Sequence, residues 1–171
     1  MSHPVVLVPH DPAWKYAASD EASRIRGILG PHLIAIHHIG STSIPGIKAK
    51  PVLDLLGVVS RIEVLDQNPR LLQRLGYDAR GEIGIPGRRY FRRPPDGPAT
   101  HHLHCFAQGD PNIDRHLLFR DYLLSHPETA TAYERLKEAL AARFPNDSPA
   151  YADTKTDFIR DIERTAAEWR K

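Results

Sequence analysis

The chain has 171 residues, of which 41% are hydrophobic and 26% are charged, and its formal net charge is +2. These values are typical of a globular domain with its own core and exclude a disordered or fibrous chain. The single cysteine, Cys105, excludes an internal disulfide framework, and the sequence shows neither a signal peptide nor a bilayer-length apolar run. We therefore expect one cytoplasmic domain over residues 1–171 with no membrane partner.

Helix starts in this sequence share one device, which is an N-cap acceptor followed by proline. Proline has no N–H to leave unpaired in a first helical turn, and its backbone angle suits that position. The device predicts helix starts at Asp11-Pro12, Asp110-Pro111 and Ser148-Pro149. The first helix is expected to end at Gly30-Pro31, and from residue 111 onward the pattern indicates helix alone.

Two runs of apolar and β-branched residues have strand length, Leu33 to Ile39 and Val52 to Val59. A segment with helical spacing, Ile62 to Leu75, follows the second run and ends at Gly76. We therefore expect two strands and then a helix.

An antiparallel pair of strands is expected next. The segments Tyr77 to Glu82 and Arg88 to Arg92 flank a Gly-Ile-Pro-Gly turn at 84–87. The proline-rich loop 93–98 cannot be regular structure, so Thr100 to Phe106 is predicted to be a further strand. The elements together predict an α+β fold with a small mixed β-sheet, flanking helices and a helical C-terminal half.

The most informative motif is His38-Ile39-Gly40-Ser41, followed by Asp54 within the second apolar run. Small residues at a corner expose backbone N–H groups to a phosphate, and a carboxylate nearby can hold a cation. An isolated Gly-Ser pair is usually an ordinary corner, and a carboxylate in a strand can also be a buried structural acceptor. The spacing favours a phosphate-and-metal site, with Asp54 as a ligand of Mg²⁺.

Six blocks of this sequence resemble successive blocks of the GrpB family, and the resemblance extends over nearly the whole chain. They are residues 38–46 (HIGSTSIPG), 49–54 (AKPVLD), 81–91 (GEIGIPGRRYF), 101–104 (HHLH), 116–123 (HLLFRDYL) and 152–155 (ADTK). The resemblance implies membership of the nucleotidyltransferase superfamily, whose pattern is Gly-Gly/Ser, a gap, and then Asp, an apolar residue, and Asp or Glu. GrpB-like domains also occur fused to dephospho-CoA kinases.

The sequence departs from that superfamily pattern at residue 56. Side chains alternate along a strand, so Asp54 and residue 56 share a face, where two carboxylates would hold the metals that bridge nucleotide phosphates. Residue 56 is leucine. A single carboxylate can contribute to a magnesium site that keeps waters and substrate oxygens, but a two-metal mechanism loses a ligand. The sequence is therefore compatible both with an enzyme and with a non-catalytic protein of the same fold.

Three histidines lie in the strand expected around residue 103. Alternation places His102 and His104 on one face and His101 on the other. With Asp54 on a neighbouring strand, His102 and His104 would suit a transition metal better than magnesium. The alternative is that they donate hydrogen bonds to phosphate or line a polar cleft.

Several charged residues are candidates for the same ligand. Glu82 could act as a general base or second metal ligand, or could pair with Arg88 or Arg89. Arg88 and Arg89 could clamp a phosphate, or form a solvated hairpin face. Further phosphate-binding candidates are Thr42, beside the Gly-Ser corner, and three cationic side chains, of which two lie on apolar helix stripes: Lys50, Arg120 and Lys155.

The residues together predict a nucleotidyltransferase-like protein that binds a nucleotide or another phosphorylated small molecule and transfers a nucleotidyl or phosphoryl group with Mg²⁺. The alternative is a non-catalytic module that binds a nucleotide or a CoA precursor after losing the second carboxylate. Association with RNA through the basic hairpin is a third hypothesis, and the near-neutral net charge weighs against nucleic acid.

Overall fold

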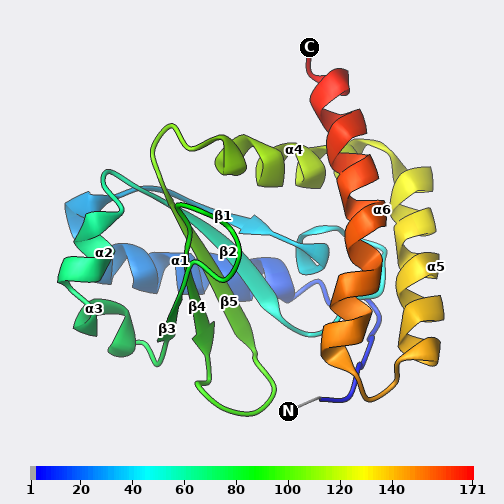
Figure 1. The fold of residues 1–171 in the computed structure, drawn as a ribbon, viewed down its shortest axis with the longest axis horizontal. Helices are drawn as coiled ribbons and strands as arrows, with labels where there is room; N and C mark the ends of the chain where they lie inside the picture. Colours follow the sequence, from blue (N-terminus) through cyan, green and yellow to red (C-terminus); the bar gives the residue numbers. More distant parts are fainter. Residues whose placement is uncertain (1–2) are drawn as a thin grey trace.

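The fold was derived from a computed structural model, which describes residues 3–171 (Figure 1). Its central sheet has five strands in the order β1-β2-β5-β4-β3. Only β2 and β5 are parallel to each other, and the other neighbours are antiparallel. The strands are β1 (Leu33–Ile39), β2 (Leu53–Val59), β3 (Asp78–Gly81), β4 (Arg89–Arg93) and β5 (His101–Ala107). The small mixed sheet expected from the sequence is confirmed.

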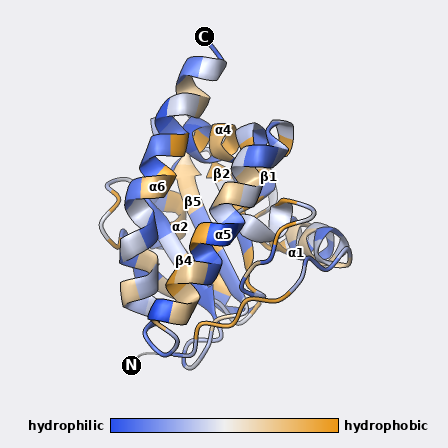
Figure 2. Ribbon diagram, turned by 90° about the vertical axis from the view of Figure 1, so that its right-hand side faces the viewer, coloured by the Kyte–Doolittle hydropathy of each residue, from blue (hydrophilic) through white to orange (hydrophobic). Residues whose placement is uncertain are grey.

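The helices divide between the two faces of the sheet (Figure 1). One face is covered by α1 (Trp14–Leu29), α2 (Glu63–Gln67) and α3 (Arg70–Gln73). The other is covered by the C-terminal helices α4 (Pro111–Ser125), α5 (Pro127–Arg143) and α6 (Ser148–Trp169). Short 3₁₀ turns at Gly30–His32 and Ser41–Ser43 precede and follow β1. In Figure 2 hydrophilic and hydrophobic bands alternate along α5 and α6, as expected for helices with one buried face.

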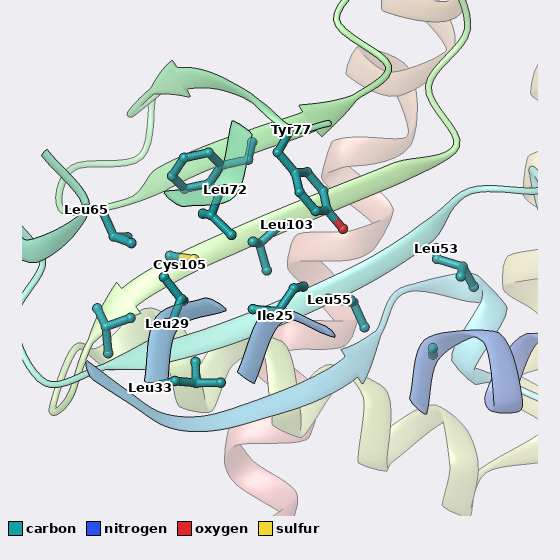
Figure 3. Packing of buried hydrophobic residues seen from close by; sticks show 13 residues of the cluster. Ile25, Leu29, Leu33, Leu53, Leu55, Leu65, Leu72, Tyr77, Leu103 and Cys105 are labelled. Atoms are coloured by element: carbon teal, nitrogen blue, oxygen red, sulfur yellow. The ribbon is translucent and has the colours of Figure 1, made fainter. Parts of the chain in front are cut away.

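The main hydrophobic core lies between α1 and the sheet. Figure 3 shows Ile25 and Leu29 of α1 packed over Leu55 and Leu103, which come from the two central strands. Because strand side chains alternate, the neighbours of Leu55 and Leu103 in sequence point to the opposite face. The residues that do so are Asp54 and Leu56 of β2 and His102 and His104 of β5.

Two smaller clusters fix the C-terminal helices. Leu56 packs with Ile39 and Phe106 beneath Ile113 and Leu117 of α4. The second cluster joins the loop after β1 to all three helices, through Ile44, Ile47, Leu123, Ala130, Tyr133 and Ile162. These contacts hold α5 and α6 over the loop that carries the Gly-Ser corner.

Three details of the predicted elements were wrong. The helix start predicted at Asp11-Pro12 lies at Trp14, since Asp11 accepts the Ala13 N–H at 2.9 Å in the turn that precedes α1. The helix expected over Ile62 to Leu75 is divided into α2 and α3, because Pro69 lacks an N–H and the Asn68 side chain donates to the Val64 carbonyl at 2.9 Å. The N-cap of α6 is Asp147, whose carboxylate accepts the Ala150 N–H at 3.1 Å, and not the predicted Ser148. At α4 the predicted cap is present, since Asp110 accepts the Asn112 N–H at 2.8 Å.

Candidate functional site

The Gly-Ser corner and Asp54 are neighbours because β1 and β2 are antiparallel. Ile39, the last residue of β1, pairs with Asp54, so Gly40 and Ser41 lie directly beside the carboxylate. Gly40 has a φ of +74°, and a Cβ built on it would lie 2.6 Å from Oδ2 of Asp54. Only glycine therefore allows this corner and this carboxylate to lie together.

Asp54 accepts hydrogen bonds from two histidines of the adjacent strand. Its Oδ1 lies 3.3 Å from Nδ1 of His102 and 3.2 Å from Nε2 of His104. The three potential ligand atoms lie within 4.8 Å of one another, which is a geometry able to hold a metal ion. As alternation predicts, His101 lies on the opposite face, where it contacts Arg93 at 2.9 Å.

The position of the Arg88 guanidinium determines which ring nitrogen of His104 carries the proton. Its guanidinium donates to the carbonyls of Glu82 at 3.0 Å and Ile83 at 2.7 Å, and it lies 3.3 Å from Nδ1 of His104. A guanidinium has no acceptor, so Nδ1 of His104 carries the lone pair and Nε2 carries the proton. In this tautomer His104 donates to Asp54 and offers no lone pair to a metal at Nε2.

Burial and hydrogen bonds set the charges of this group. Burial raises the pKa of the Asp54 carboxyl, but the hydrogen bonds from His102 and His104 outweigh it and hold that pKa well below its ordinary value. Burial lowers the pKa of His104. Burial, with the charges of His104 and Arg115, lowers the pKa of His116 to about 3. At neutral pH the site therefore presents an ionised carboxylate beside the neutral imidazoles of His104 and His116.

A pocket of about 220 Å³ lies between Asp54 and the C-terminal helices. We call it the lysine pocket, because three lysines from different segments line it: Lys50 before β2, Lys137 on α5 and Lys155 on α6. Asp54 is the one carboxylate in its lining. The other side chains of the lining that carry hydrogen-bonding groups are Ser41, Thr42, His102 and Tyr151.

The ammonium groups of the lysine pocket have little to neutralise them. Lys137 donates to the Lys48 carbonyl at 2.6 Å, and Lys50 donates to the Ser148 hydroxyl at 3.2 Å, so both acceptors are uncharged. The Lys155 ammonium lies 4.9 Å from the centre of the Tyr151 ring. Burial, reinforced by the charge of Lys155, lowers the pKa of Lys137 to about 7. Burial likewise lowers the pKa of Lys50 and of Lys155.

A second pocket of about 190 Å³ adjoins the first and shares Ser41, Asp54 and Lys155 with it. We call it the histidine pocket, after His104 and His116. Its far wall comes from the helices and includes Arg115, Phe119, Tyr133, Ile159 and Glu163. Arg115 and Glu163 form an ion pair of 3.0 Å across that wall. Asp54 therefore stands at the boundary between a strongly basic pocket and a more balanced one.

Three predicted site residues lie away from both pockets. Arg89 is on the α1 face of the sheet, where it pairs with Asp66 of α2 at 2.8 Å. Glu82 is exposed and accepts the Gly87 N–H at 2.6 Å, which closes the turn before β4. Arg120 pairs with Asp121 at 2.9 Å and donates to the His38 carbonyl at 3.3 Å. Arg88 contacts the site only through His104. The structure thus brings together Gly40, Ser41, Thr42, Lys50, Asp54, His102, His104 and Lys155.

The sequence reasoning missed Lys137, Tyr151 and His116 as site residues. Lys137 could have been found by the argument used for Lys155, because it lies on the buried stripe of α5 with Ala130, Tyr133 and Leu140. The sequence shows His116 and Tyr151 as a polar and an aromatic residue in predicted helices, which does not distinguish them from other residues of those helices. Their position in the site depends on how the helices pack, for which the sequence carries no local signal.

The family model described as GrpB protein matches residues 4–165. The chain belongs to the GrpB family. It is 43% identical over 167 residues to the UPF0157 protein YqkA of Bacillus subtilis. The aligned residues cover 98% of this chain and 48% of YqkA. The chain is 36% identical to the glutamate-rich protein GrpB of Alkalihalophilus pseudofirmus, with 92% of this chain and 93% of that one covered.

Relatives of this GrpB chain also include longer proteins. It is 29% identical to a dephospho-CoA kinase of Mycolicibacterium paratuberculosis, covering 97% of this chain and 47% of the kinase. The chain thus spans about half the length of the kinase and of the Bacillus relative. No helix within residues 3–171 is long and apolar enough to cross a membrane.

Solved structures support the fold. The GrpB protein of Enterococcus faecalis superposes with a TM-score of 0.90 at 38% identity, covering 97% of this chain and all of that one (100%). The Cid1 poly(U) polymerase with bound Mg and 3'-dATP has a TM-score of 0.54 at 14% identity, covering 80% of this chain and 44% of that one. This GrpB chain therefore has a nucleotidyltransferase-like fold, as the resemblance implied.

Proposed function

We propose that this GrpB chain binds a nucleotide, with its phosphates in the lysine pocket, and transfers a nucleotidyl or phosphoryl group with Mg²⁺. The observation that carries the proposal is an excess of hydrogen-bond donors in a pocket that opens onto one ionised carboxylate. Three lysine amino groups line this pocket, and the buried hydroxyl of Tyr151 has no hydrogen-bond partner among residues 3–171. A polyphosphate supplies the acceptor oxygens and the negative charge that this set lacks.

The residues of the pocket have distinct parts in such a reaction. The turn that begins at Ser41 would hold the phosphates beside Asp54, and Lys50, Lys137 and Lys155 would neutralise their charge. Phosphoryl transfer needs little covalent chemistry from a protein, and its catalysis is mainly positioning and electrostatic stabilisation. Cid1 and a terminal uridylyl transferase from Trypanosoma brucei with bound dUTP, at 9% identity and a TM-score of 0.52, share the fold and give the proposal its reaction class.

The donor set at Asp54 fits one Mg²⁺ shared with the ligand. Oδ1 of Asp54 accepts from both histidines, and Oδ2, against Gly40, is the oxygen left for a cation. Mg²⁺ is commonly held by one or two carboxylates, substrate phosphates and waters. When bound, the ion would stabilise the charge that develops on the phosphate. The second carboxylate position is taken by Leu56, which is fully buried (0% exposed) in an apolar cluster, so a second ion has no ligand there.

A transition metal held by Asp54, His102 and His104 is the less favoured alternative. Imidazole ligands suit such ions, and the three donors lie close together. Metal-bound histidines, however, normally donate their second N–H to an acceptor. His104 faces the Arg88 guanidinium at that position, which is itself a donor.

The experiment that tests the proposal is calorimetric titration of the wild-type chain and Asp54→Asn with ATP, UTP and CoA precursors, each with and without Mg²⁺. We expect Mg²⁺ to strengthen nucleotide binding to the wild type, and Asp54→Asn to abolish that gain. Metal-free binding should persist in the variant, since the lysines remain. Arg89→Gln is the matched control, because Arg89 lies on the far face of the sheet.

Turnover separates the proposed enzyme from its alternative. The alternative is a non-catalytic module that binds a nucleotide or a CoA precursor, and the buried Leu56, in place of a second carboxylate, favours it. Because relatives include a dephospho-CoA kinase, CoA precursors are the ligands to test for this alternative. Magnesium-dependent binding with release of pyrophosphate or phosphate supports the enzyme. Tight binding without turnover on any acceptor supports the module, and an absence of binding by every phosphorylated compound rejects both.

A further inference from the structure

A third hollow, of about 410 Å³, adjoins the lysine pocket on the side away from the histidine pocket. It shares Lys50, Val52 and His102 with the lysine pocket, whereas Asp54 does not line it. We call it the apolar hollow, because most of its lining is proline, valine and alanine: Pro4, Val6, Pro51, Val52, Pro98 and Ala99. Its volume lies within the range of small-molecule sites.

Two of the segments that line the apolar hollow are fixed in place by hydrogen bonds. The N-terminal segment is held by a two-way backbone bridge between Val8 and Ala49, at 2.9 and 3.0 Å, and by the Val5 N–H on the Pro145 carbonyl at 2.9 Å. The loop between β4 and β5 is held by Arg92, which donates to the Gly97 carbonyl. Prolines have fixed backbone angles, so the walls lose little entropy when a ligand binds.

Its surface is apolar yet open. Val6 is 53% exposed, which places a β-branched side chain in water at the rim of the hollow. Its polar lining residues are His3, Arg92, Ser148 and two residues that it shares with the lysine pocket, Lys50 and His102. Because His102 directs Nδ1 to Asp54, its Nε2 is the ring nitrogen that can contact a ligand. An apolar slot with a few edge groups suits a flat ring that carries hydrogen-bonding groups on its rim.

We infer that the apolar hollow binds the base of the same nucleotide whose phosphates occupy the lysine pocket. The inference rests on the proposed function and deepens it by assigning the uncharged half of the ligand. The shared wall, with Lys50 at the boundary, makes the two spaces continuous, so a ligand with a charged and an aromatic end matches both. The burial of the ring against proline and valine supplies affinity, and the lysines supply the attraction for phosphate.

The first arm of the test varies the ligand on the wild-type protein. Calorimetry compares ATP and UTP with ribose 5-triphosphate and with inorganic tripolyphosphate, which lack the base. We expect the nucleotides to bind at least about tenfold more tightly than either compound, as burial of an aromatic ring predicts. Equal affinities for all four would overturn the inference and leave the proposed function standing. Failure of all four to bind would overturn both.

The second arm varies the hollow. Ala99→Trp fills it from an irregular loop, and Val52→Thr replaces an apolar methyl group with a hydroxyl of the same shape. Ile34→Ser is the matched control, since Ile34 is an exposed apolar residue (44%) on β1, outside the hollow. We expect Ala99→Trp to reduce nucleotide affinity to that of tripolyphosphate, with tripolyphosphate affinity unchanged. Because Val52 also borders the lysine pocket, Val52→Thr is judged by the ratio of nucleotide affinity to tripolyphosphate affinity, which we expect to fall severalfold.

Two outcomes would overturn the assignment. One is a folded Ala99→Trp protein, checked by thermal melting, that binds nucleotides as the wild type does. The other is a change in oligomeric state with unchanged nucleotide affinity, which would assign the hollow to a second copy of the chain. If Ala99→Trp does not fold, Val52→Thr decides: an unchanged ratio of the two affinities in that variant rejects the hollow as the base site.

Discussion

Each face of the sheet carries a carboxylate among basic and histidine side chains, and the two groups differ in how their charges are matched. On the α1 face, Glu21 is fully buried (0% exposed) and accepts from Arg93 at 2.9 Å, Arg24 at 3.1 Å and Tyr77 at 3.1 Å. On the opposite face, Asp54 faces Lys50 and Lys155 across a pocket. Within residues 3–171, neither of these two ammonium groups forms an ion pair with a carboxylate, and Lys50 instead donates to the Ser148 hydroxyl.

The difference indicates which group stabilises the fold and which one is prepared for a ligand. Around Glu21, burial raises the pKa of the carboxyl, but the hydrogen bonds and the charge of Arg93 outweigh burial, so the net pKa is below the ordinary value. The ion pair is therefore complete without any ligand. Around the lysine pocket, the same desolvation lowers the pKa of Lys137 without full compensation. A fold retains such unmatched charge at a cost in stability, which is typical of binding sites.

Glu21→Gln is the change with the largest expected effect on stability. The substitution removes the buried charge that pairs with Arg93 and Arg24 and leaves the part-buried Arg93 guanidinium without its carboxylate, which costs about 3–5 kcal/mol. Urea denaturation measures the loss, and Asp20→Asn, an exposed neighbour on α1, is the control. Nucleotide affinity of the folded variant should be unchanged. A loss below 1 kcal/mol would contradict the structural role of this group.

Lys137→Met should act in the opposite direction on stability. The folded-state pKa of Lys137, about 7, lies below the ordinary value of 10.5, so the unfolded chain binds more protons between these pH values. Stability should therefore rise with pH through that window in the wild type, and the penalty is complete below pH 7. Without the ammonium, the variant should be more stable near pH 7 by about 1–4 kcal/mol, less the hydrogen bond lost to Lys48.

Thermal or urea unfolding of Lys137→Met and wild type at a series of pH values checks this sign. The two stability curves should converge towards pH 10.5, where Lys137 is neutral in both states. Tripolyphosphate affinity should fall in the same variant, because one of three ammonium groups is gone. A variant that is both less stable and unchanged in binding would assign Lys137 to the fold alone.

The sequence predicted the fold better than the site. Proline after an acceptor marked the start of α4, and apolar runs marked β1 and β2, because these signals are local. The Gly-Ser corner and Asp54 were predicted to meet because adjacent strands bring such residues to one edge of a sheet, and the antiparallel pairing of β1 with β2 does so. The break between α2 and α3 was missed, although Pro69 carried the signal for it.

The arginine cluster shows why the remaining site residues could not be placed. Arg88 and Arg89 are adjacent, so strand alternation sends them to opposite faces, and one residue of register decides which reaches the cleft. That register is set by the pairing of β4 with β5, in which Arg89 lies opposite Cys105 and Tyr90 opposite His104. Similarly, the lysine pocket exists only once α5 and α6 have packed over the corner.

Gly40→Ala tests the close approach of the corner to Asp54. A φ of +74° with an extended ψ of −175° is a region used essentially by glycine, and residues held there cost about 1–3 kcal/mol. The new Cβ would also displace the Asp54 carboxylate, so we expect the magnesium-dependent part of nucleotide binding to disappear. Gly27→Ala is the control, because Gly27 lies within α1 with nothing within 4 Å of a built Cβ and should be stabilised.

Arg89→Gln should have the smallest effect of the series, although the sequence made Arg89 a phosphate-binding candidate. Its partner Asp66 is half exposed (50%), and an ion pair of that kind contributes about 0–1 kcal/mol. Lys155→Gln, compared in the same titrations, should weaken tripolyphosphate binding strongly, because Lys155 lines both pockets beside Asp54. Equal losses of phosphate affinity in the two variants would mean that the ligand reaches the α1 face, and the division between a structural and a binding face of the sheet would fail.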